Sequence, residues 1–232
     1  MNMYKTRILI TSFLSFLLLS PINVGAQETT VTSDLEMWNN FAISKKLGDR
    51  WKVSLEEELR FTEDISRFDL FFTDLGLDYK INKHFSAGVN YRFYQNKNND
   101  GDFITQHRLS AYIKFKQELD RFTFGYRLQF QNKDEDFLSS NPENNVYNLR
   151  NKISVDYDIK NFKLEPYFQA ELFRKYETGE ESYFNKVRWK LGASYPVTRK
   201  SDIELFYLID NELNQSYPKT TYVLGLGYKF SF

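Results

Sequence analysis

The C-terminal stretch Thr221–Phe232 reads Thr-Tyr-Val-Leu-Gly-Leu-Gly-Tyr-Lys-Phe-Ser-Phe and alternates between two kinds of side chain. Successive side chains of an extended strand point to opposite faces. One face would carry Tyr222, Leu224, Leu226, Tyr228, Phe230 and Phe232. The other would carry Val223, Gly225, Gly227, Lys229 and Ser231. The stretch therefore predicts a terminal β-strand with one apolar face and one small or polar face.

The position of this strand at the end of the chain is a second indication of the fold. A final strand with an unbroken apolar face and a terminal aromatic residue is typical of the strand that closes a bacterial outer-membrane β-barrel. In that class of protein the C-terminal aromatic residues resemble the signal that the barrel-assembly machinery reads. We therefore interpret Tyr228, Phe230 and Phe232 as a C-terminal assembly signal, with the assembly machinery as an expected partner.

The composition agrees with a barrel and disfavours other classes. The chain has 232 residues, 41% of them hydrophobic, and its mean hydropathy is -0.56. A membrane-spanning helix needs about 20 consecutive apolar residues, and no such run occurs after the first twenty residues. Aromatic residues make up 18% of the chain, which suits the aromatic girdles of a membrane barrel.

The charge balance and the absence of cysteine exclude further functions. The formal net charge is +0, so no basic excess is available to neutralise nucleic-acid phosphates. With Cys 0, the chain has no disulfide, no thiolate nucleophile and no cysteine metal site. We expect neither nucleic acid nor a cofactor as a partner.

The first 26 residues have the features of an export signal. Lys5 and Arg7 precede the apolar run Ile8–Leu19, and small residues end at Ala26. The apolar run is too short for a permanent anchor helix, which needs about 20 residues. We predict a cleaved signal peptide over residues 1–26 and one barrel domain over residues 27–232.

The remaining chain divides into segments with a two-residue period, separated by turns. Most segments reach the length of about 9 to 11 residues that a tilted membrane strand needs. The predicted strands are Asp34–Lys46, Trp51–Phe61, Phe68–Ile81, Phe85–Tyr94, Ile104–Glu118, Phe122–Gln131, Tyr147–Asp158, Phe162–Phe173, Tyr183–Tyr195, Asp202–Asp210 and Thr220–Phe232.

The connections alternate between short and long. Short links lie at 47–50, 82–84, 120–121, 160–161 and 196–201, and longer polar links lie at 62–67, 95–103, 132–146, 174–182 and 211–219. This asymmetry is typical of an outer-membrane barrel, whose periplasmic turns are short and whose extracellular loops are long. Aromatic residues follow four short links and would form part of a periplasmic girdle: Trp51, Phe85, Phe122 and Phe162.

Two other β architectures share the alternating pattern. A soluble β-sandwich also alternates apolar and polar residues, but its connections need not alternate in length so regularly. A lipocalin-like periplasmic cup would place the apolar face inside, and periodicity alone does not distinguish it from the inverse arrangement. The terminal strand and the loop asymmetry favour the membrane barrel, and the cup is the alternative.

The strand number and one proline do not fit the simplest barrel. Bacterial single-chain barrels have an even number of strands, whereas eleven segments are visible here. Either a short strand within residues 27–33 completes twelve, which we favour, or Asp34–Lys46 lies inside a ten-stranded barrel. Pro166 lies within a predicted strand and lacks a donor for the ladder, so we expect a bulge there.

Several sequence stretches resemble a known family. They are the segment around Trp38, the run Trp51–Phe61, the stretch Gly76–Tyr79 and the stretch His107–Ser110. Together they resemble the family called domain of unknown function 2490 (DUF2490). The resemblance implies a small outer-membrane-type barrel of Gram-negative bacteria with no established activity. With it, the prediction is an all-β, antiparallel, up-and-down transmembrane barrel of 10–12 strands.

The predicted lumen is rich in charge. Arginines from six different strands would point inward: Arg60, Arg92, Arg108, Arg127, Arg150 and Arg188. Acidic residues would face or flank them: Glu56, Glu58, Asp74, Asp78, Asp156, Glu165, Glu171 and Glu204. Buried charges must pair or be hydrated. Either they form salt bridges that fill a structural or interaction barrel, or the arginines line a narrow pore for small anions.

Catalysis and metal binding have little support in the sequence. Acyl transfer needs a nucleophile and a base on one face, but His107 and Ser110 are three residues apart on a strand and point to opposite faces. The other histidine, His84, lies in a short turn. Residues 96–101 only superficially echo a calcium loop, and the acidic stretch Asp134–Asp136 with Glu143 is expected to be solvated, although lipopolysaccharide is an expected neighbour of such loops. We predict no enzyme, no cofactor and no metal site.

Overall fold

The computed structural model describes residues 32–97, 101–134, 146–177 and 179–232. Within these residues the chain forms eleven β-strands that join into one closed barrel, which confirms the predicted fold class. The strands are β1 Thr32–Leu47, β2 Trp51–Thr62, β3 Arg67–Lys80, β4 Phe85–Lys97, β5 Phe103–Leu119, β6 Phe122–Asp134, β7 Val146–Tyr157, β8 Glu165–Glu177, β9 Tyr183–Pro196, β10 Ser201–Glu212 and β11 Lys219–Ser231. The predicted signal peptide, the central residues of the calcium-like stretch and most of the acidic loop lie outside the described residues.

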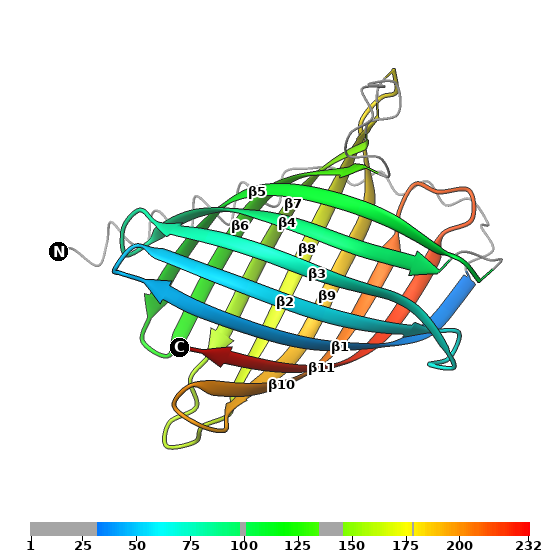
Figure 1. Ribbon diagram of the computed structural model, residues 1–232. Helices are drawn as coiled ribbons and strands as arrows, with labels where there is room; N and C mark the ends of the chain where they lie inside the picture. Colours follow the sequence, from blue (N-terminus) through cyan, green and yellow to red (C-terminus); the bar gives the residue numbers. More distant parts are fainter. Residues whose placement is uncertain (1–31, 98–100, 135–145, 178) are drawn as a thin grey trace.

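The barrel closes through a parallel pair of strands. Each strand is antiparallel to the next one along the chain, whereas β1 and β11 run side by side in the same direction (Figure 1). Their register extends from Thr32 opposite Lys219 to Ser44 opposite Ser231. An odd number of strands, each antiparallel to the next, can close only in this way, because the first and last strands then point in the same direction.

This closure corrects the prediction of twelve strands. Since β1 is paired with β2 on one edge and with β11 on the other, no place in the ring remains for another strand among the described residues. The alternative prediction, with Asp34–Lys46 inside a ten-stranded barrel, is also wrong, because that segment is part of the wall. Two-residue periodicity identifies strands but does not say which strand pairs with which.

The two ends of the barrel differ in their connections. One end, here called the short-turn end, carries links 48–50, 81–84, 120–121, 158–164 and 197–200, and the C-terminus. The opposite, long-loop end carries links 63–66, 98–102, 135–145, 178–182 and 213–218. The asymmetry is weaker than predicted, because the link 63–66 has only four residues and the link 158–164 has seven.

Pro166 explains the length of the link 158–164. Strand β8 begins at Glu165 instead of Phe162, and its pairing with β7 begins at Tyr167. Pro166 therefore has a partner only on β9, where it lies opposite Ala193, and its missing N–H breaks no ladder bond to β7. The bulge expected at Pro166 lies instead between Phe173 and Arg174, and a second irregularity lies between Arg60 and Phe61.

The outer face of the barrel is apolar and the inner face is polar. Outward residues such as Leu205 and Leu191 are 63% and 61% exposed, whereas inward Glu171 is 4% exposed. Three of the predicted girdle residues begin strands at the short-turn end and contact a neighbouring ring; for example, the ring centroids of Trp51 and Tyr79 are 4.6 Å apart. This polarity is the opposite of a lipocalin-like cup, so the alternative with an apolar interior is wrong. Within the described residues no helix is long and apolar enough to span a bilayer.

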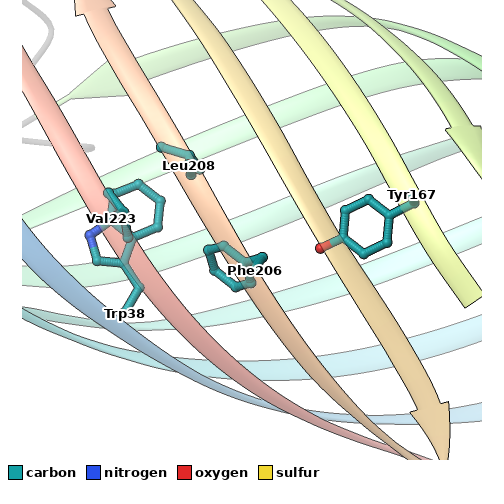
Figure 2. Packing of buried hydrophobic residues seen from close by; sticks show 5 residues of the cluster. All are labelled: Trp38, Tyr167, Phe206, Leu208 and Val223. Carbon is teal, nitrogen blue, oxygen red and sulfur yellow. The ribbon is translucent and has the colours of Figure 1, made fainter. Parts of the chain in front are cut away.

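A small apolar cluster lies inside the wall next to the closing seam. It consists of Trp38 on β1, Phe206 and Leu208 on β10, Val223 on β11 and Tyr167 on β8 (Figure 2). Glycines make this packing possible: the ring of Phe206 lies against Gly225, and the Tyr167 ring lies against Gly192. A Cβ at either glycine would collide with the ring that covers it.

Candidate functional site in the barrel lumen

The lumen holds the six arginines singled out in the sequence, each on a different strand. They lie on β2, β4, β5, β6, β7 and β9, at the alternate positions that face inward: Arg60, Arg92, Arg108, Arg127, Arg150 and Arg188. Their partners in hydrogen bonds and ion pairs are other inward side chains. The charged lumen is therefore the candidate functional site.

Buried carboxylates in the described part of the chain are all paired with cations. They are Glu58, Asp74, Glu171, Glu204 and Asp210. Arg60 lies 2.6 Å from Glu58, and Arg92 donates to Asp74 at 2.8 Å. A buried carboxylate without a partner would cost several kcal/mol, so these pairs are needed for the interior to exist.

Four carboxylates of the described residues are each shared by two cations. Asp78 pairs with Lys52 and Lys114; Glu171 pairs with Arg127 and Arg150; Glu204 pairs with Lys190 and Lys229; Asp210 pairs with Lys186 and Arg188. In each group the positive charge exceeds the negative charge. These groups give their parts of the lumen a positive electrostatic character.

Two of the shared carboxylates belong to similar arrangements. The Tyr112 ring on β5 leans across Gly88 of β4, and its hydroxyl donates to Asp78 of β3 at 3.0 Å. The Tyr167 ring on β8 leans across Gly192 of β9 in the same way, and its hydroxyl donates to Glu204 of β10. Each tyrosine thereby ties together strands that are not neighbours.

Several of the arginines stack on aromatic rings. The guanidinium carbon of Arg60 lies 3.6 Å from the centroid of the Trp38 ring, and that of Arg92 lies 3.5 Å from the centroid of Phe72. Arg150 lies 4.6 Å from the Phe173 ring. Such cation–π contacts contribute about 0.5–2 kcal/mol, more when they are desolvated. The arginines are therefore held against the wall.

The sequence did not identify these aromatic partners or one of the acids. Trp38, Phe72 and Phe173 were not assigned to the lumen, although each occupies the inward parity of its strand. Asp210 was also missed; it lies six residues after Glu204 on β10 and accepts two hydrogen bonds from Arg188, at 3.3 and 2.6 Å. The alternation of inward and outward positions along each strand would have assigned all four residues to the lumen.

The other predicted acids have different roles. Glu56 accepts a hydrogen bond from Asn40. Asp156 and Glu165 take part in no ion pair within the described residues. They lie toward the short-turn ends of β7 and β8.

The two histidines lie in different surroundings, and neither is beside Ser110. His107 faces outward, where its ring bonds to the hydroxyl of Tyr91 at 2.7 Å, whereas Ser110 is buried on the inner face. His84 lies in a short turn against the carbonyl oxygen of Lys116 at 3.1 Å. In the described ranges, no group of three or more His, Cys, Asp or Glu side chains is arranged to hold a metal ion.

The C-terminal aromatics lie on the outer face of the last strand. Tyr228 stacks on Phe41 of β1, with ring centroids 5.7 Å apart. Phe230 and Phe232 form an edge contact at 4.8 Å, and Phe232 is 62% exposed. Their proposed reading by the assembly machinery stays a prediction.

A closed ring of strands with an apolar exterior and a charged, paired interior defines a β-barrel of the membrane type. The chain belongs to the family described as protein of unknown function DUF2490, whose model matches residues 35–221. This match confirms the resemblance in the sequence. A search of curated proteins finds no match.

Solved structures similar to this chain include two barrels. One is the β domain of the Bordetella autotransporter BrkA, with 12% sequence identity, a TM-score of 0.49, and coverage of 78% of this chain and 83% of that chain. The other is the NanC porin, with 14% identity, a TM-score of 0.48, and coverage of 80% and 90%.

The shared carboxylates give a first testable prediction. Replacing Glu171→Gln leaves Arg127 and Arg150 without their common anion, and breaking such a buried ion pair costs about 3–5 kcal/mol. We expect the free energy of unfolding of the refolded barrel, measured in urea, to fall by this order. Glu177→Gln is the matched control, because its pair with Lys175 is more exposed and should contribute at most about 1 kcal/mol. Equal effects of the two substitutions would contradict a structural role for the lumenal pairs.

Proposed function

We propose that this protein is an outer-membrane β-barrel whose lumen is closed by its own side chains, and that it acts as a structural or interaction protein and not as an enzyme. The observation that carries this proposal is the pairing of every buried carboxylate among the described residues with a lumenal cation. Ion pairs of this kind link the strands of the barrel wall to one another. The carboxylates held in these pairs are not free to bind a substrate or to move protons.

The outer face supports a membrane location. Large apolar side chains from all parts of the ring are exposed on it, including Leu75, Ile113, Leu191 and Leu205. Soluble proteins rarely expose contiguous apolar patches of more than a few hundred Å². The strands have 12 to 17 residues, which exceeds the length of about 9–11 residues that a tilted membrane strand needs. A lipid bilayer solvates such a surface, with the short-turn end in the periplasm.

The size and the filling of the lumen support a closed interior. Barrels of about 8 strands are filled by side chains, whereas those of about 16–18 strands leave an aqueous channel. This barrel lies nearer to the smaller class, and large inward rings occupy its interior: Trp38, Phe72 and Tyr94 are 5%, 2% and 3% exposed. Expected partners are outer-membrane lipid and lipopolysaccharide around the wall, and the assembly machinery during insertion.

A narrow pore for small anions is the second candidate. It is favoured by the four carboxylates that are each shared by two cations, because this excess of positive charge would attract anions into any open path. The two candidates share the same fold and location. They differ in whether the space between the side chains is continuous from one end to the other.

Fractionation and conductance distinguish these functions. We expect the protein in the outer-membrane fraction, with migration in electrophoresis that changes on heating, and no conductance steps in planar bilayers. Discrete, anion-biased steps that change when Arg92, Arg127 and Arg150 are replaced together by Gln would support the pore instead. Recovery as a soluble periplasmic protein would contradict both candidates.

One carboxylate lies on the outer face, between apolar neighbours. Glu57 of β2 is exposed and accepts hydrogen bonds from the hydroxyl of Thr73 on β3, at 2.8 and 2.9 Å. Outward Leu55 and Leu59 flank it along the strand. If this face meets lipid, the carboxyl group lies well inside the hydrocarbon layer, where a polar group is costly.

Glu57 therefore tests the orientation of the barrel. In lipid vesicles, Glu57→Leu should raise the free energy of unfolding by up to about 2 kcal/mol, because charged side chains on the lipid face destabilise barrels. The matched control is Glu58→Leu, one residue further along on the inner face, which should lower it because Arg60 loses its partner. Destabilisation or aggregation caused by Glu57→Leu would contradict contact of this face with lipid.

A further inference from the structure

We propose that the lumen contains a binding site for a small oxyanion, formed by Lys152 of β7 and Arg127 of β6, next to Lys114 of β5. This inference goes beyond the proposed function, because a barrel that does not conduct can still hold an anion among its wall residues. It follows from the register of three strands and from the hydrogen bonds that these side chains make and lack.

The register places three cations in a row. Lys114 lies directly opposite Arg127, and Arg127 lies directly opposite Lys152. All three face the lumen, and side chains in such positions have Cβ atoms about 4.5–5.5 Å apart. Like charges directly opposite each other destabilise a sheet. The row therefore needs negative charge from elsewhere.

The available carboxylates supply only part of that charge. Lys114 donates to Asp78 at 2.9 Å, but Asp78 also pairs with Lys52. Arg127 donates to Glu171 at 2.8 Å, and Glu171 accepts two more hydrogen bonds from Arg150, at 3.0 and 2.8 Å. Asp78 and Glu171 therefore each also neutralise a cation outside the row, Lys52 and Arg150 respectively.

Among the described residues Lys152 has no carboxylate within ion-pair distance, and it interacts with Glu171 and Asp156 only at longer range. It lies opposite Glu171 in the register, yet it forms no ion pair with it. Its ammonium group makes one long hydrogen bond, to the side-chain oxygen of Gln169 at 3.5 Å. An ammonium group has three donors, so most of its hydrogen-bonding capacity is unused.

Arg127 adds a second unused donor on the neighbouring strand. Its Nε–H is buried and has no hydrogen-bond partner. A buried donor without a partner is destabilising, and more so when the group is charged. The unused groups of Arg127 and Lys152 are all donors and carry positive charge, so the ligand that satisfies them is an anion with several acceptor atoms.

Two small residues lie beside these donors. One inward position closer to the short-turn end, Gly125 of β6 lies opposite Ser154 of β7. The next inward residue on β7 after Ser154 is Asp156, whose carboxylate limits how far an anion can extend in that direction. Several cationic donors with a hydroxyl group nearby favour a compact tetrahedral oxyanion, such as phosphate or sulfate.

Titration of the folded, detergent-solubilised full chain with inorganic phosphate tests this site. Calorimetry at constant ionic strength should show saturable binding by the wild-type protein. Lys152→Gln should weaken it at least tenfold, and Lys152→Arg should retain it. Lys186→Gln is the matched control: it also removes one lumenal cation, but from the pair of cations on Asp210 near the long-loop end, and should leave binding unchanged.

Stability provides a readout that does not depend on the phosphate titration. In phosphate-free chloride buffer, Lys152→Gln should unfold at the same temperature as the wild type or higher, because it removes an uncompensated charge. Phosphate should raise the unfolding midpoint of the wild type and not that of Lys152→Gln. The proposal is overturned if the wild type shows no saturable binding, if Lys152→Gln binds equally well, or if chloride at equal ionic strength protects as much as phosphate. None of these results depends on whether the barrel conducts.

Discussion

The hydrogen-bonded pairing of β1 with β11 is the interaction on which the rest of the structure depends. Without it, both strands would be edges with unpaired N–H and C=O groups, which water can solvate but hydrocarbon cannot. The seam covers all of β11 and β1 from Thr32 to Ser44, and just after β11 the N–H of Phe232 donates to the carbonyl oxygen of Ser44 at 2.9 Å. Inside the seam, fully buried Val223 and the ring of Trp38 pack with Phe206 and Leu208.

Closure determines the chemistry of the interior. Once the apolar faces of all strands are turned outward, the charged faces converge in a narrow space where each charge must find a partner. Tyrosine rings that cross glycines, arginines that lie on aromatic rings, and carboxylates shared between two cations are three ways of meeting this requirement. The third way leaves net positive charge, and Lys152 is the cation of the row that forms no close ion pair within the described residues.

The architecture was largely predictable from the sequence, because strand periodicity and loop lengths depend on local residues. The bounds of most strands, the outward apolar face and the family resemblance follow from such patterns. The strand number did not follow, since periodicity gives faces and not neighbours. For the same reason the inward arginines were visible as a set, but the sharing of Glu171 between Arg127 and Arg150 depends on the register of β6, β7 and β8. The bulge predicted at Pro166 is absent because strand β8 begins later than the apolar pattern suggests.

The most direct test of this account is a disulfide across the closing seam. Ser44 and Ser231 are opposite each other, with side-chain oxygens 3.1 Å apart, and the chain has Cys 0, so Ser44→Cys with Ser231→Cys introduces the only thiols. An eleven-stranded ring predicts that oxidation links these two cysteines within the folded barrel, while Ser44→Cys with Ser194→Cys, on the non-adjacent strand β9, stays unlinked. A folded barrel in which the first pair does not link would mean that another strand lies between β1 and β11, and would contradict the parallel closure.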